Sequence, residues 1–318
     1  MPVMLSEAIA LLNVQPGRAY VDATVGGGGH FSAIRDRLQG TGLLIGIDRD
    51  PLALQAAQRQ PFDNTRLFQG NYADITDFAK AAGLHTIDGG IIADLGVSSM
   101  QLDQAERGFS FLRDGPLDMR MDPSQPIDAA TILNTYSEHE LADIIYRYGE
   151  ERMSRKIAKA IVQARPITTT KELSDIVSRC IHTTHGDRSG RSRRKSAYRK
   201  PLDTSHPATR TFQAIRIAVN NELTSLEKFL HESLALMAPG ARLVIISFHS
   251  LEDRLVKQIF RQYAQGCVCP PRQPVCTCNH KPQLLIITRK PVLASDEEVL
   301  ANIRSRSAKL RAGEKITY

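Results

Sequence analysis

The chain has 318 residues, of which 42% are hydrophobic and 24% are charged, and it carries a formal net charge of +7. This composition is typical of a globular protein with a sizeable core and excludes a wholly disordered chain. The sequence has no run of about eighteen apolar residues, and its first residues lack a basic leader. We therefore expect a cytoplasmic protein that is neither secreted nor inserted in a membrane.

Strand and helix patterns alternate over the N-terminal third of the chain. We predict strands at residues 18–25, 42–48, 65–70 and 88–95, and helices between them at 32–38 and 51–59. This alternation predicts an α/β fold in which a doubly wound, mostly parallel sheet is covered by helices on both faces.

The first predicted strand runs into a glycine-rich turn at residues 25–30, VGGGGH, which leads into a helix. Glycine lets a ligand approach the backbone closely, and a helix N-terminus offers free N–H groups, although a merely flexible loop has the same composition. Asp48 ends the next strand, twenty residues after Gly28. A carboxylate there can accept both ribose hydroxyls of an adenosine, and a helix-capping role is the alternative.

Two adenosine-containing cofactors fit such an arrangement. NAD sites follow the pattern GxGxxG, but Phe31 stands where the third glycine would pack the helix against the strand. S-adenosylmethionine has no pyrophosphate and does not need that pattern. Tyr72 and Asp94 follow the next two strands, where the ring can stack on adenine and the carboxylate can hold the methionine ammonium. A half-buried loop tyrosine and a helix-capping aspartate are the alternatives.

Helix signals replace the alternation over residues 128–182. Two capping boxes, Ser137 with Glu140 and Thr169 with Glu172, precede periodic apolar segments. We therefore predict a helical domain inserted into the α/β domain.

The α/β pattern returns in the C-terminal third. Apolar residues repeat at three- and four-residue steps over 212–234, which predicts one long helix ending at Pro239 and Gly240. We further predict a strand at 243–248, a helix at 251–263 capped by Ser250, a strand at 283–288 and an exposed basic tail at 305–315. The α/β domain thus comprises residues 1–105 and 211–318, and the helical insert comprises 106–210.

Most of the positive charge lies in one segment. Between residues 185 and 210 there are eight Lys or Arg and two Asp, and residues 188–200 add Gly, Ser and Tyr198. This mixture predicts an arm that neutralises RNA phosphates and stacks on one base, whereas a solvated surface is the general alternative.

Four of the five cysteines lie close together in the sequence. They form two CxC pairs, Cys267 with Cys269 and Cys276 with Cys278. Such pairs can surround a zinc ion, although the usual spacing in zinc sites is CxxC. The sequence leaves a structural zinc and four free thiols as alternatives.

Seven motifs together resemble one protein family. They are GGGGH at 26–30, GIDRD at 46–50, DLGVSS at 94–99, RGFSF at 107–111, GPLDMRM at 115–121, HPATRTFQ at 206–213 and SFHSLEDR at 247–254. The chain resembles the bacterial ribosomal RNA small subunit methyltransferase H family over most of its length.

This resemblance implies a class I (Rossmann-like) methyltransferase in which the inserted helical domain recognises the substrate. It implies methyl transfer from S-adenosylmethionine to the exocyclic N4 of a cytosine in 16S ribosomal RNA, at the decoding centre of the small subunit. It also leaves a homodimer open. The residues that match the cofactor contacts of the family are Gly28, Gly29, His30, Asp48, Tyr72, Asp94 and Gln101.

The sequence defines the catalytic residues less clearly than the cofactor contacts. The segment after the fourth strand lacks the Pro-Pro-aromatic motif that DNA amino-methyltransferases carry there. Our hypothesis is that Asp94 or Asp118 accepts a hydrogen bond from the cytosine amino group, with His249 or the pair Ser98 and Ser99 nearby. A surface ion pair for Asp118 and an ordinary loop role for His249 are the alternatives.

Two other functions are compatible with parts of the sequence. A noncatalytic RNA-binding or ribosome-assembly factor could retain the fold, but the glycine turn, Asp48 and Asp94 are all in place. An NAD-dependent oxidoreductase would need neither the basic segment nor a turn without its third glycine. The sequence therefore favours the methyltransferase.

Overall fold

The computed structural model describes residues 2–58, 63–186, 206–270, 273, 275, 277–278 and 280–317. The chain forms two compact units, one comprising Met1–Ser98 and Leu223–Tyr318 and the other comprising Ser99–Glu222. Helix α10 (Thr209–Asn220) belongs to the second unit, whereas the predicted boundary at 210/211 assigned it to the α/β domain. The basic segment at 188–200 lies outside the described residues.

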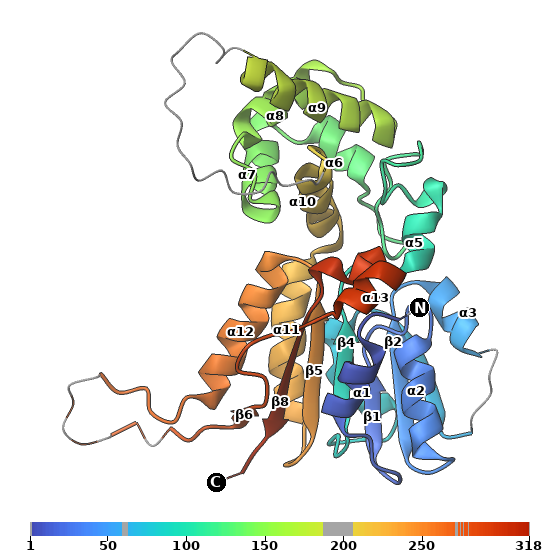
Figure 1. Ribbon diagram of the computed structural model, residues 1–318, viewed down its shortest axis with the longest axis vertical. Helices are drawn as coiled ribbons and strands as arrows, with labels where there is room; N and C mark the ends of the chain where they lie inside the picture. Colours follow the sequence, from blue (N-terminus) through green and yellow to red (C-terminus); the bar gives the residue numbers. More distant parts are fainter. Residues whose placement is uncertain are drawn as a thin grey trace. The chain divides into compact units, whose positions relative to one another are not determined.

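The first unit contains one eight-stranded sheet with the order β3-β2-β1-β4-β5-β8-β6, in which β7 also pairs with β8 (Figure 1). The first five strands of this order are parallel, and β8 is antiparallel to β5, β6 and β7. The predicted doubly wound, mostly parallel fold is confirmed. The strands are β1 (Ala19–Asp22), β2 (Leu43–Asp48), β3 (Thr65–Gln69), β4 (Gly90–Asp94), β5 (Arg242–Ser247), β6 (Leu284–Ile286), β7 (Val292–Leu293) and β8 (Lys309–Lys315).

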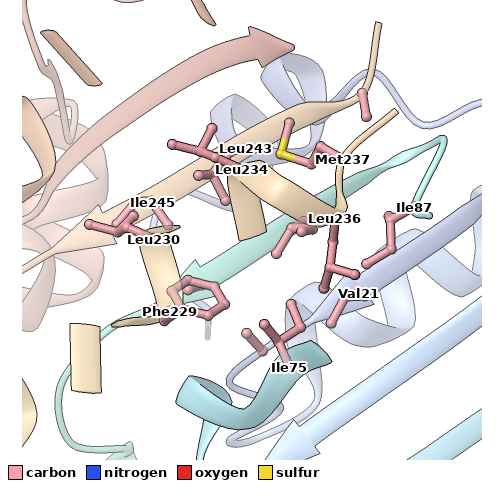
Figure 2. Packing of buried hydrophobic residues seen from close by; sticks show 14 of the residues in the cluster. Val21, Ile75, Ile87, Phe229, Leu230, Leu234, Leu236, Met237, Leu243 and Ile245 are labelled. Atoms are coloured by element: carbon pink, nitrogen blue, oxygen red, sulfur yellow. The ribbon is translucent and has the colours of Figure 1, made fainter. Parts of the chain in front are cut away.

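Alternate residues of the strands face two separate cores, because successive side chains of a strand point to opposite faces. Val21 faces the core formed with α4 (Ile75–Ala81), α11 (Glu222–Leu236) and α12 (Ser250–Ala264). Figure 2 shows Phe229, Leu230 and Leu234 of α11 in this core.

The second core covers the other face of the sheet. Tyr20 points into it and is fully buried beneath α1 (Leu5–Leu12). Helices α2 (Gly29–Leu38) and α3 (Pro51–Gln58) complete this layer. Both faces of β1, β2, β4 and β5 are therefore apolar, and the charged side chains of these four strands are confined to their ends, whereas β3 exposes Arg66.

The second unit is helical. Helix α7 packs against α8 and α10, and α8 packs against α9. Both predicted capping boxes are present, because Ser137 pairs with Glu140 and Thr169 pairs with Glu172. No helix in the described parts of either unit is long and apolar enough to cross a membrane. The helices are α5 (Ser99–Asp103), α6 (Ala129–Thr135), α7 (Glu138–Gly149), α8 (Ser154–Gln163), α9 (Thr170–Gly186) and α10.

The predicted single helix over 212–234 is wrong, because the structure has α10 and α11 separated by Asn221. This residue is left-handed, with φ 50° and ψ 40°, and its backbone N–H donates to the carbonyl oxygen of Ile217. Asparagine adopts this conformation at lower cost than most residues. The apolar spacing continues across the single interruption, so periodicity alone does not reveal the break.

The predicted exposed tail at 305–315 is also wrong, because its second half is the interior strand β8. Leu310 and Ala312 are fully buried, and Arg311 donates to Asp253 of α12 with 2.7 Å between Nε and Oδ1. Lys309 lies 3.4 Å from the other oxygen of Asp253. The basic composition misled the prediction because these charges are paired within the fold.

Substituting Asp253 tests whether this pairing holds β8. We expect Asp253→Ala to lower the free energy of unfolding by about 3 kcal/mol, because it leaves the buried Arg311 without its carboxylate. Combining it with Arg311→Met removes the buried charge and should recover much of the loss. Urea denaturation measures both variants, and a single variant as stable as the wild type would contradict the prediction.

Candidate functional site

The glycine turn lies between β1 and α2. Gly26 and Gly28 have φ of 51° and 78°, and Gly28 precedes the first residue of α2 without a side-chain cap. A Cβ added to Gly27 or Gly28 would have no atom within 4 Å, whereas one on Gly26 would lie 3.9 Å from Cβ of Ser98. The turn therefore presents open backbone beside a helix N-terminus, where a ligand can approach closely.

Asp48 closes this turn from the end of β2. Its Oδ2 accepts from the backbone N–H of Gly26 at 2.7 Å, and its Oδ1 accepts from that of Asp50 at 2.8 Å. Burial raises the pKa of Asp48 to about 6 despite these two hydrogen bonds. Asp50, and not Asp48, accepts from the helical N–H of Leu52. The helix-capping role considered for Asp48 thus belongs to Asp50. Asp48 shapes the turn, and its oxygens keep lone pairs that can accept from a ligand.

Gly29 and His30 are held by the N-terminal segment. A Cβ on Gly29 would lie 2.6 Å from Cγ of Pro2, so close packing requires glycine here. Nε2 of the buried His30 lies 3.1 Å from the carbonyl oxygen of Val3, so Nε2 carries the hydrogen and Nδ1 has a free lone pair. Burial lowers the pKa of His30 to about 4, so the ring is neutral at pH 7. Nδ1 faces Oδ2 of Asp94 at 3.8 Å, and the two do not form an ion pair.

Asp94 ends β4 and has a buried oxygen without a partner. Its backbone N–H donates to the hydroxyl of Thr24 at 2.6 Å, but Oδ1 has no hydrogen bond to the described residues. Burial raises the pKa of this carboxyl well above its usual range, and the carboxylates of Asp22, Glu252 and Glu298 raise it further. A hydrogen-bond donor or a positive charge at this position would satisfy the buried oxygen and offset the repulsion from the neighbouring carboxylates.

Asp22 is a residue of this site that sequence reasoning missed. It ends β1 beside β4, and only 1% of it is exposed. Oδ1 accepts from the backbone N–H of Thr24, whereas Oδ2 has no partner among the described residues. Burial raises its pKa to about 7, with a further contribution from Asp48. An aspartate at the end of an otherwise apolar strand is the signal that could have identified it.

Tyr72 lies in a short 3-10 helix, Tyr72–Asp74, after β3. Its ring meets Phe229 edge-on with 5.0 Å between the centroids, and the guanidinium of Arg49 lies 5.6 Å from the ring centre. Arg49 is itself fixed by a hydrogen bond to Ser225 at 2.9 Å. The aromatic ring predicted to stack on adenine is therefore held in one orientation on the first unit.

Gln101 and Asp118 belong to the second unit. Gln101 lies on α5. Both carboxylate oxygens of Asp118 accept from the Arg120 guanidinium at 2.8 Å, and Oδ1 also accepts from its backbone N–H at 2.9 Å. Burial opposes the ionised form of Asp118, but the Arg120 contacts outweigh it and lower the pKa. Asp118 therefore forms the ion pair that was the alternative to a catalytic role.

His249 begins α12 and caps it, so the predicted cap at Ser250 is wrong. Nδ1 of His249 accepts from the backbone N–H of Glu252 at 3.4 Å, and the Glu252 carboxylate accepts from the backbone N–H groups of His249 and Phe248. Nε2 lies 3.1 Å from Oε1 of Glu252, but the angle is too poor for a hydrogen bond. Histidine is an uncommon cap, which is why the pattern favoured the neighbouring serine.

The first unit thus brings together the features that S-adenosylmethionine requires. The turn at Gly27 and Gly28 leaves open space for a ligand, and Asp48 lies against that turn. Asp94 offers a buried oxygen to which no described residue donates. A cationic amino acid moiety satisfies that oxygen, so the residues fit this cofactor.

Comparisons with known proteins also indicate a methyltransferase. A model of the MraW methylase family matches residues 1–316. A protein of Trichlorobacter lovleyi named Ribosomal RNA small subunit methyltransferase H is 50% identical, covering 99% of this chain and 97% of that protein. Proteins with the same name from Geobacter sulfurreducens and Heliobacterium modesticaldum are 49% and 47% identical, each covering 99% of this chain and 98% of its own length. The similarity therefore spans both units.

The carboxylates at this edge predict how binding of S-adenosylmethionine depends on pH. An ammonium group binds the ionised carboxylates best, and their raised pKa values keep them protonated in acid, so affinity should rise with pH. Between about pH 5.5 and about pH 7 the ligand amine stays charged, and the rise is at most about tenfold per pH unit for one released proton. Calorimetry at several pH values measures this dependence.

Asp22→Asn provides the critical comparison. Removing this charge lowers the pKa of Asp94, so binding should depend less on pH than in the wild type. The exposed Asp36, paired with Arg35, gives the matched control Asp36→Asn. An unchanged pH dependence in Asp22→Asn would contradict the coupling of the two carboxyls.

Proposed function

Because the chain belongs to the MraW methylase family, we propose that it methylates ribosomal RNA of the small subunit, the substrate that its relatives' names state. The chain is an S-adenosylmethionine-dependent methyltransferase. The structural observation that carries the proposal is the buried Oδ1 of Asp94, without a partner among the described residues, at the carboxyl edge of a doubly wound sheet. Ligands of such sheets bind at that edge, where the strand order reverses between β1 and β4.

The acceptor atom that we propose is the exocyclic N4 of a cytosine in 16S ribosomal RNA, at the decoding centre. The resemblance of the seven motifs supports this choice. The N4 lone pair is delocalised into the ring, so the protein must accept hydrogen bonds from the amino group and align it with the donor. When bound, S-adenosylmethionine supplies an electrophilic methyl group on its sulfonium.

Most of the cofactor-binding residues that we propose belong to the first unit. In this unit, Asp48 accepts from Gly26 of the glycine turn, which supports an adenosine site at the turn, and Tyr72 offers a fixed aromatic ring. Gly29, His30 and Asp94 are the remaining proposed contacts in this unit, and Gln101 stays a prediction from the family resemblance. Gly29 packs closely against Pro2, and His30 bonds to the carbonyl oxygen of Val3. We therefore propose that Gly29 and His30 shape the site by holding the N-terminal segment.

Three residues were candidates for contact with the amino group. Asp118 is engaged through both oxygens by Arg120, and His249 caps α12 through Nδ1. Asp94 retains an oxygen without a partner in the described structure. We therefore place Asp94 first for contact with the reacting groups, and Asp118 and His249 become positioning candidates.

The cellular context follows from the proposed substrate. We infer that the enzyme acts in the cytoplasm on RNA within the small ribosomal subunit. The sequence of an arm at 188–200 supports contact with phosphates, and a homodimer stays a prediction. Reaction of naked RNA and of isolated subunits, compared side by side, distinguishes the two substrates.

Mapping labelled methyl groups tests the proposed reaction. Small subunits from a strain lacking this enzyme should gain one methyl group on N4 of a single cytosine of 16S RNA.

We expect Asp94→Asn to lower S-adenosylmethionine affinity by about 10- to 100-fold, the loss typical of a hydrogen bond to a charged group. Asp77 is exposed on α4, so Asp77→Asn is the matched control.

Two outcomes would overturn these assignments. A methyl group on another base or on protein would refute the proposed acceptor. Normal cofactor affinity and turnover in Asp94→Asn, with abolished turnover in Asp118→Asn, would move the role from Asp94 to Asp118.

Neutralising the arm tests RNA binding. Residues 188–200 contain seven Lys or Arg, and replacing them by Gln or Ser keeps the length of the segment. We expect weaker RNA binding and a shallower dependence of log K on log salt, by about 0.7 for each phosphate that the arm no longer neutralises. Affinity for S-adenosylmethionine should not change. An unaltered salt dependence in filter-binding titrations would refute the role of the arm.

A further inference from the structure

Three cysteine thiols converge in the connection between α12 and β6. Cys267, Cys269 and Cys278 are all reduced, and their Sγ atoms lie within 4.8 Å of one another. Sγ of Cys278 is 3.8 Å from Sγ of Cys267, although eleven residues separate them in the chain. The fourth cysteine of the predicted set, Cys276, lies outside the described residues.

The sulfur spacing distinguishes a metal site from a disulfide. In tetrahedral zinc sites each Zn–S bond is about 2.3 Å, which places two ligand sulfurs about 3.8 Å apart. A disulfide requires about 2.05 Å between its sulfurs. The 3.8 Å between Cys267 and Cys278 therefore matches an edge of a zinc tetrahedron.

Exposed apolar side chains lie next to the thiols in the described part of this loop. Val268 and Val275, which lie beside the cysteines in sequence, are 54% and 71% exposed, and Cys267 is exposed as well. Exposed apolar side chains contribute little to holding a loop together. A bound metal is a common substitute where a segment has too little core.

The backbone also favours thiolates in this loop. The N–H of Cys269 donates to Sγ of Cys267 at 3.4 Å. Such N–H contacts stabilise negative sulfur, which is the form that binds metal.

We propose that Cys267, Cys269 and Cys278 bind a structural Zn²⁺ ion that closes the loop between α12 and β6. Each thiol that is still protonated releases its proton to solvent on binding, and no electron is transferred. Three thiolates fill three of the four tetrahedral positions. Thiolate ligands in this number select zinc over Mg²⁺ or Ca²⁺, which prefer oxygen. The site lies apart in sequence from every residue proposed for the cofactor.

Metal analysis of the full-length protein tests this inference. We expect about one zinc per chain after purification with a reductant and without chelators. Cys278→Ser should lose most of this zinc. Cys180 provides the matched control, because it is buried on α9 with its thiol 3.7 Å from the carbonyl oxygen of Lys156. Cys180→Ser should therefore keep the metal.

A second measurement does not depend on the folding of a variant. Wild-type protein stripped by a chelator and refilled with Co²⁺ should show the absorption of thiolate-to-cobalt charge transfer. Zinc-free wild-type protein whose thiols all react with Ellman's reagent would overturn the proposal. Bound iron in place of zinc, or a disulfide between Cys267 and Cys278 in protein kept under reductant, would overturn it as well.

Discussion

Three parallel strands end in carboxylates that are buried or partly buried at one edge of the sheet, and this constraint organises the site. Asp22, Asp48 and Asp94 end β1, β2 and β4, so the register of the sheet keeps them close. Backbone N–H groups donate to Asp22 and Asp48, but Asp22 and Asp94 each keep a buried oxygen without a partner in the described structure. Such an arrangement costs stability until a ligand supplies donors or positive charge. The fold therefore stores part of the affinity for a cationic cofactor.

Local patterns were sufficient to predict the parallel sheet and the glycine turn. The strands are apolar on both faces and are separated by helical segments, which is a strong signal for this architecture. Asp48 and Asp94 were predicted because each ends a recognisable strand beside the turn. The acceptor base came from motif resemblance alone, since neither the turn nor these carboxylates specify a nucleotide.

The errors have two physical origins: contacts between residues far apart in the sequence, and local backbone or cap geometry that the apolar pattern does not show. The burial of β8 depends on the pairing of Arg311 with Asp253, which composition does not show. Asn221 changes hand within an unbroken apolar period. The cap of α12 depends on the side-chain geometry of His249 with Glu252. Asp22 was missed because its importance arises from neighbours on β2 and β4.

The place of β8 in the sheet bears on the order in which the protein can fold during synthesis. Among the described strands β8 comes last in the sequence, yet it lies between β5 and β6. The edge of β5 therefore stays unpaired until residues 309–315 have left the ribosome. An open strand edge favours pairing with other chains, so the nascent protein is prone to aggregate until β8 has paired with β5.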